Sequence, residues 1–146
     1  MRRVALIGMN NPLASKPEFA LWPDPVGCTG WRLWQMLHAR TGATKTDYLR
    51  AFHRYNLTTD RRWDIQEARL NWDEMVDDLQ ENFDTVVLLG ASVRQATGAV
   101  LPSVLITRAV VAIPHPSGLC RWYNEDRNRQ LVEVILEELY TGAIGA

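Results

Sequence analysis

The sequence predicts a three-layer α/β/α domain around a four-stranded, mainly parallel sheet. Its strand-like segments are almost uniformly apolar, which is typical of parallel strands that helices cover on both faces. Segments with helical spacing of apolar residues alternate with these strands along the chain. The chain has 146 residues, 47% of them hydrophobic and 23% charged, and these values fit one domain spanning residues 1–146.

The first strand is expected at residues 4–9, which form a continuous apolar run. Residues 10–29 include four prolines, so this segment cannot be a regular helix or a central strand. A loop of this length inside a compact domain is usually functional or disordered, and Phe19, Leu21 and Trp22 argue against disorder. We therefore expect this long loop to fold over a site.

Helices and strands alternate through the rest of the chain. In order, the sequence predicts a helix at 30–40, a short helix from 46 to 52, a weak strand at 54–58, a long helix at 62–82, a strand at 84–90, a short helix that Ser92 caps and Gly98 ends, a strand at 108–114 and a closing helix at 124–140. Four of the six tryptophans, residues 31, 34, 63 and 72, lie at core-compatible spacing on these helices.

Charge and composition exclude several classes of protein. The 16 Lys and Arg residues against 17 Asp and Glu residues give a net charge of -1, so any contact with nucleic acid must be local. All the basic residues except Lys16 and Lys45 are arginines, a bias that suits phosphate contacts but that GC-rich coding also produces. No apolar run is long enough for a membrane span or a secretion signal, so a cytoplasmic monomer without membrane contact is expected. The two cysteines and three histidines lack metal-ligand spacing, and no cofactor is predicted.

Polar residues follow three of the expected strands. Asn10 and Asn11 follow the first, Asn56 lies near the second, and His115 follows the last. In open parallel sheets ligands bind beyond the carboxyl ends of the strands, so these side chains are expected to converge.

The surroundings of His115 favour a functional residue, although a structural hydrogen-bonding histidine is the common alternative. Pro114 and Pro116 fix the backbone on either side, and Ser117 and Gly118 form a turn that brings main chain close to a ligand. The glycine-rich phosphate motifs are missing. Cys120 is a weaker candidate, because a cysteine nucleophile needs an orienting group and a lowered pKa that the sequence does not show.

Two segments carry a resemblance to a known family. Residues 8–12, Gly-Met-Asn-Asn-Pro, resemble the first motif of the uracil-DNA glycosylase superfamily, and residues 115–119, His-Pro-Ser-Gly-Leu, resemble the second. The apolar strand at 86–90 with its short helix, and the asparagine at position 56, occupy matching places in the order of the chain. The chain looks closest to compact members of this superfamily from bacteria and phages. It has one more asparagine between Gly8 and Pro12 than the family motif.

The resemblance implies a base-excision site. A water that attacks the sugar C1′ would be oriented by Asn11 or by Asn10, and the extra residue leaves open which of them faces the substrate. His115 would stabilise the departing base at its O2 atom. Asn56 would read the base edge, with Phe19 or Trp22 stacked on the base and Met9 beside it.

The resemblance also implies contacts with DNA around the second motif. Leu119 would wedge into the duplex as the base is flipped out. The phosphate contacts would come from the residues around it, Ser117, Gly118, Arg121 and Trp122, together with Ser92. An alternative for Trp122 and Tyr123 is that they only staple the final helix to the sheet.

Three functions remain after this reasoning. The first is hydrolysis of the N-glycosidic bond of uracil or a modified pyrimidine in DNA. The second keeps the bond chemistry but takes a free nucleotide or a hypermodified base, which the modest size and neutral charge motivate. The third is a non-catalytic protein that binds DNA or a nucleotide with the same fold.

Overall fold

One sheet organises the protein in its computed structural model, which describes residues 1–98 and 100–145. Within these residues the sheet has five strands in the order β2-β1-β3-β5-β4. The strands are β1 (Val4–Gly8), β2 (His53–Asn56), β3 (Thr85–Leu89), β4 (Leu105–Ile106) and β5 (Val110–Ile113). All neighbours pair in parallel except β4, which runs antiparallel to β5. The sequence predicted four strands, and this number is wrong because the short edge strand β4 is a fifth.

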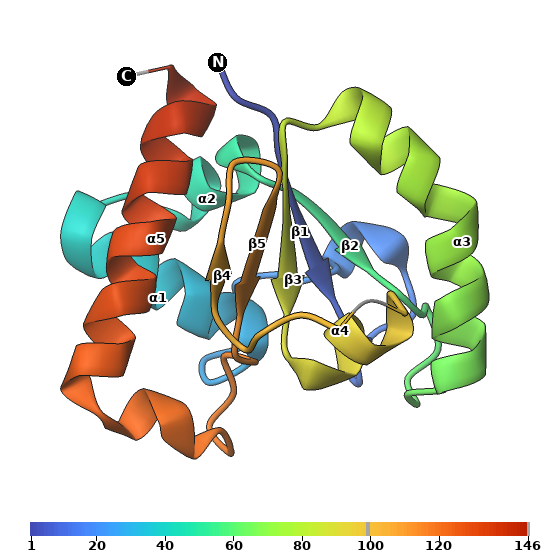
Figure 1. The fold of residues 1–146 in the computed structure, drawn as a ribbon. Coiled ribbons are helices and arrows are strands. Elements are labelled where there is room, and N and C mark those ends of the chain that lie inside the picture. Colours follow the sequence, from blue (N-terminus) through green and yellow to red (C-terminus); the bar gives the residue numbers. More distant parts are fainter. Residues whose placement is uncertain (99, 146) are drawn as a thin grey trace.

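Helices cover both faces of the sheet, so the predicted three-layer α/β/α fold is confirmed (Figure 1). On one face lie α1 (Thr29–Thr41), α2 (Lys45–Ala51) and α5 (Asp126–Ile144). The other face carries α3 (Ile65–Asn82) and α4 (Ala91–Ala96). Two short 3-10 helices, η1 (Pro17–Phe19) and η2 (Arg121–Asn124), lie in the loops after β1 and β5.

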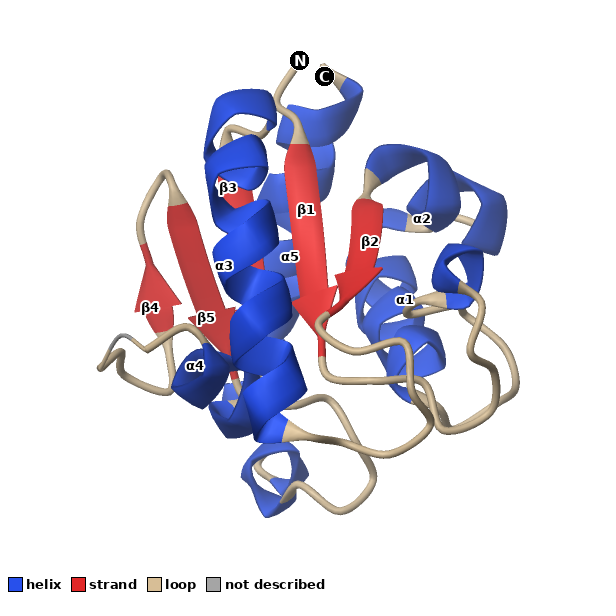
Figure 2. Cartoon of the chain, turned by 90° about the vertical axis from the view of Figure 1, so that its right-hand side faces the viewer, coloured by secondary structure: helices blue, strands red, loops and turns tan. Residues whose placement is uncertain are grey.

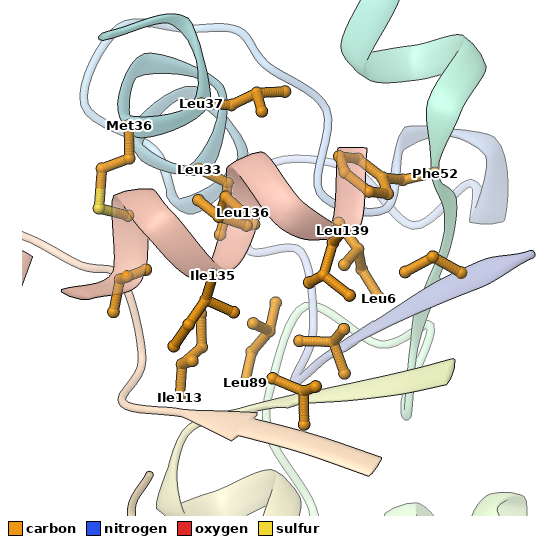
Figure 3. Close-up of a cluster of buried hydrophobic side chains, with 14 of the residues drawn as sticks. Leu6, Leu33, Met36, Leu37, Phe52, Leu89, Ile113, Ile135, Leu136 and Leu139 are labelled. Carbon is orange, nitrogen blue, oxygen red and sulfur yellow. The ribbon is translucent and has the colours of Figure 1, made fainter. Parts of the chain in front are cut away.

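The two sheet faces support separate hydrophobic cores. The larger core packs α1, α2 and α5 against alternate residues of the central strands, among them Leu6, Leu89 and Ile113. Figure 3 shows Leu89 and Ile113 beneath Ile135 of α5. The second core packs α3 and α4 against the opposite face, where Ala5, Ile7 and Leu88 lie. Every residue of β1 and β3 is buried, and apart from Thr85 at the start of β3 these strands are continuous apolar runs in the sequence.

Three of the four tryptophans predicted to lie in the core pack against it. Trp34 packs against the larger core, and Trp63 and Trp72 against the second. Trp31, on α1, is half-buried and belongs to neither cluster among the described residues.

Capping groups shift several helix ends from the predicted positions. The Asp64 carboxylate accepts hydrogen bonds from the N–H groups of Gln66 and Glu67, so α3 begins three residues later than expected, at Ile65. Thr44 and Asp47 form a capping box that starts α2 at Lys45. The prediction that Ser92 caps α4 is wrong, because Gly90 occupies the N-cap position and no side chain caps the helix.

The parallel strands end at one edge of the molecule, where the longest loops gather (Figure 2). The chain passes outward from β1 to β2 on one side and from β3 to β5 on the other, so the direction of winding reverses between β1 and β3. Such a reversal opens a crevice at the carboxyl ends of the two strands. None of the helices in the described ranges is both long and apolar enough to span a membrane.

Candidate functional site

A cavity of about 390 Å³ lies beyond the carboxyl ends of β1 and β2. The long loop after β1 forms most of its wall, and the end of β2 and the start of α1 complete it. Five of the residues predicted to bind or attack the substrate line this one cavity, namely Asn10, Asn11, Phe19, Trp22 and Asn56. The fold thus brings together side chains that are far apart in the sequence.

Asn56, the last residue of β2, presents an unused acceptor. It pairs with Gly8 across the parallel strands, and a Cβ atom on Gly8 would lie only 2.7 Å from the Asn56 Oδ1 atom. The glycine of the first motif is therefore what leaves room for the amide. Asn56 Oδ1 is buried and has no hydrogen-bond partner within the described part of the chain. Buried acceptors of this kind are rare and call for an explanation such as a bound group.

The two asparagines of the first motif make different hydrogen bonds. Asn11 donates from Nδ2 to the Phe19 carbonyl at 3.1 Å and accepts from the Leu13 N–H at 2.9 Å, so its amide holds the loop in shape. Asn10 donates from Nδ2 to the Arg61 carbonyl at 2.6 Å. Its Oδ1 atom makes no hydrogen bond to any residue that the structure describes, and this oxygen is free to accept one from a water.

Hydrogen bonds and ring contacts fix the aromatic wall of the cavity. Phe19 and Trp22 meet edge to face, with ring centroids 5.2 Å apart. The Arg54 guanidinium lies 5.4 Å from the Trp22 ring centroid and donates to the Ala20 carbonyl at 2.8 Å. The buried Tyr48 hydroxyl donates to the carbonyl of Leu21 at 2.8 Å. The long loop is thereby tied to β2 and α2.

His115 lies on the other side of the reversal point, at the end of β5. It packs on Gly90 at the end of β3, where a Cβ atom would come within 2.7 Å of the His115 Cβ. Burial lowers the pKa of His115 below its ordinary value of 6.5, so the ring is neutral at pH 7. Neither ring nitrogen has a protein partner among residues 1–98 and 100–145. His115 is not part of the cavity wall that holds Asn56.

The segment after His115 borders a second cavity of about 490 Å³. Ser117 and Gly118 line it, and an Arg32 amino group would lie 2.8 Å from a Cβ atom on Gly118. Leu119 is 95% exposed, and Arg121 is also exposed. Trp122 packs against the larger core beside Tyr123, which is the stapling role left open by the sequence.

Met9 and Ser92, which were also predicted as site residues, lie away from both cavities. Met9 is partly buried and packs against the second core, on the α3 side of the sheet. Ser92 lies in the first turn of α4 and is half-buried. Neither lines the cavity of Asn56 or that of Ser117.

Sequence reasoning missed a basic residue beside the site. Arg54 lies two positions before Asn56 on β2, so both side chains point to the same face of the sheet. The two-residue spacing between Arg54 and Asn56 was the sequence feature that could have placed Arg54 beside the site. Within the described ranges, no group of three or more His, Cys, Asp or Glu side chains could hold a metal ion.

Comparison with known proteins assigns no family to the chain. No family model matches it, and no curated protein matches it either.

Proposed function

We propose that this protein hydrolyses the N-glycosidic bond between a pyrimidine base, uracil or a modified form, and deoxyribose in DNA. The observation that carries the proposal is the buried, unpartnered Oδ1 of Asn56 in a cavity that Phe19 and Trp22 also line. A flat ring with a hydrogen-bonding edge suits such a cavity, because the amide serves the edge and the aromatic rings serve the faces.

The recognition step uses both ends of the Asn56 amide. Its Oδ1 accepts from N3–H of the base, and its Nδ2 donates to the O4 atom. Stacking on an aromatic side chain adds about 1–3 kcal/mol per base and does not depend on base identity. The preference for a uracil-like edge therefore comes from Asn56.

The bond-breaking step suits a site without a carboxylate base. The C1′–N1 bond breaks with its electron pair leaving on the base, and the sugar becomes oxocarbenium-like. Neutral His115 donates a hydrogen bond to the developing charge on O2, a role that its lowered pKa supports. Water then adds at C1′, oriented by Asn10 or Asn11, and its proton neutralises the base anion.

The two halves of this mechanism lie on either side of the point where the sheet changes its winding direction. Asn10 and Asn56 flank the β1 side, and His115 packs over Gly90 on the β3 side. A base that enters the cavity with its N3 and O4 atoms on Asn56 and its O2 atom toward the ends of β1 and β3 would contact both groups.

Contact with duplex DNA is supported by Leu119. A large apolar side chain that is 95% exposed at a loop tip makes no contribution to the core. Inserted between bases, it would fill the gap that a flipped nucleotide leaves. The net charge of -1 restricts phosphate contacts to local arginines such as Arg121.

The test is release of base from single- and double-stranded oligonucleotides that contain uracil. We expect His115→Ala to slow single-turnover release by about 10²–10³-fold, the effect of losing one donor to a developing anion. Asn56→Ala is expected to cost at least about tenfold. Asn82→Ala, at the exposed end of α3, is the matched control and should leave the rate unchanged.

Other outcomes would replace the proposal. Hydrolysis of free deoxynucleotides without action on any oligonucleotide would establish the nucleotide hydrolase instead. Binding of DNA or nucleotide without turnover on any substrate would establish a non-catalytic binder.

A further inference from the structure

A smaller cavity of about 290 Å³ adjoins the base cavity. Asn11, Ala14 and Asn56 line both, so the two spaces share a wall. The small cavity extends from this wall along β2 to Arg54 and Thr58. None of the steps proposed above uses it.

Unsatisfied polar atoms are concentrated in this small cavity. Arg54 Nε, Asn56 Oδ1 and Thr58 Oγ1 are buried without a hydrogen-bond partner, and within the described ranges no other side-chain nitrogen or oxygen shares that condition. All three residues line the cavity, and Thr58 is 0% exposed. The proposed base contact accounts for Asn56 Oδ1 but not for Arg54 Nε or Thr58 Oγ1. Each lost hydrogen bond of this kind costs free energy in the unliganded protein, so this remaining pair is typical of a binding site.

Arg54 also carries a charge without a counterion. One terminal nitrogen donates to the Ala20 carbonyl, and no carboxylate lies within 4.0 Å of the guanidinium among the residues that the structure describes. Arginine remains protonated in proteins, so this charge cannot be removed by titration. The other charged groups facing the cavity are Lys16 and Glu18, both exposed, and the local balance is positive.

We propose that the small cavity is an oxyanion subsite in which Arg54 and Thr58 hold a phosphate or carboxylate attached to the substrate. An oxyanion would accept from Arg54 Nε–H and from the Thr58 hydroxyl, and it would neutralise the guanidinium. Its attachment to a base held by Asn56 follows from the shared wall. The inference rests on the proposed function, because it names the substrate of that site as a pyrimidine nucleoside that carries an acidic group.

Two sources can supply the acidic group, and ligand binding distinguishes them. Deoxyuridine has no acidic group, dUMP adds a phosphate on the sugar, and 5-carboxy-2′-deoxyuridine adds a carboxylate on the base. We expect one of the two acidic ligands to bind the full chain at least about tenfold more tightly than deoxyuridine. Preference for dUMP identifies the phosphate, and preference for the carboxy compound identifies a base substituent.

Substitution of Arg54 tests whether it is the cause of that preference. Arg54→Gln should abolish the preference for the acidic ligand over deoxyuridine, whereas Arg54→Lys should retain part of it. Arg69→Gln, on the exposed face of α3, removes the same charge elsewhere and should have no effect. Far-UV circular dichroism verifies that each variant is folded.

The proposal is overturned if the wild type binds all three ligands alike, or if folded Arg54→Gln keeps the preference. If no nucleoside binds, inorganic phosphate is the probe. A Tm raised by phosphate in the wild type but not in Arg54→Gln supports the subsite, and equal Tm values with and without phosphate overturn it. Base release is assayed separately, so loss of the glycosidase proposal would not be mistaken for loss of the subsite.

Discussion

Replacing Gly90 with alanine tests how the end of β3 positions His115. Gly90 has φ 92° and ψ 168°, a region that is essentially restricted to glycine, and a side chain there costs about 1–3 kcal/mol. An alanine Cβ would also lie 2.7 Å from the His115 Cβ, which is closer than two such carbons approach in proteins. Relieving this overlap costs a further ~1–3 kcal/mol. The sum predicts a loss of about 2–6 kcal/mol in the free energy of unfolding.

Gly42→Ala is the matched control. Gly42 also has a positive φ, 71°, at the C-cap of α1, but a Cβ there would meet nothing within 4 Å. Its replacement should therefore cost only the backbone penalty of about 1–2 kcal/mol. Urea unfolding of both variants measures the difference, and base release measures the effect on His115.

Gly90→Ala should lose more stability than Gly42→Ala, and an equal or smaller loss would contradict the prediction. Folded Gly90→Ala should also release base more slowly than the wild type, and an equal rate would contradict the functional part of the prediction. Either result would mean that His115 does not depend on the space above Gly90.

Three further predictions concern single residues. Tyr48→Phe should lower the free energy of unfolding by about 1–3 kcal/mol, because the Leu21 carbonyl loses its buried donor, and a change below about 0.5 kcal/mol in urea unfolding would contradict this. Because the pKa of His115 is lowered on folding, the unfolded chain binds more protons below pH 6.5, so stability should decline as the pH falls through that value. The pKa of His53 is also lowered on folding, so His115→Gln should reduce this decline in stability without abolishing it. If stability depends on pH in the same way in His115→Gln and in the wild type, His115 is not the source of the decline. Leu119→Ala should leave stability within about 0.5 kcal/mol of the wild type and slow base release from duplex DNA more than from single strands, whereas equal slowing on both would exclude a wedge.

The sheet was largely predictable because parallel strands buried on both faces leave a plain trace in the sequence. β1, β3 and β5 are apolar runs, and each appears close to its expected position. β4 was missed because two residues, Leu105 and Ile106, are too few to show a pattern. Its pairing depends on the β5 strand that follows it rather than on its own sequence.

The base cavity was predictable in part, because its walls come from the ends of parallel strands. Placing Asn10 and Asn56 at the carboxyl ends of parallel strands is enough to expect them together, and both line one cavity. The role of Arg54 was hard to predict, because its two-residue spacing from Asn56 is a weak signal and a single arginine in a weak strand is normally a solvent-facing residue. Only the tertiary structure shows that its Nε atom is buried beside Asn56.

His115 illustrates a different limit. Its flanking prolines mark a constrained turn in the sequence, but its contact with Gly90 joins two strand ends that are separate in the chain. Sequence periodicity describes each strand alone and carries no information about which loop residues meet above the sheet. The positive φ of Gly90 likewise arises from the exit of β3 and not from a recognisable turn motif.

The brevity of β4 has a consequence for how the protein behaves at high concentration. An exposed sheet edge is a template on which a second chain can add a strand, and the risk increases with the length of the edge. β4 offers only two residues to such a partner, whereas cross-β stacking requires segments of about six or seven. Lying antiparallel along β5, it shields part of a longer apolar strand behind it. The shortest strand of the described sheet therefore covers part of the β5 edge and leaves only two residues for another chain to pair with.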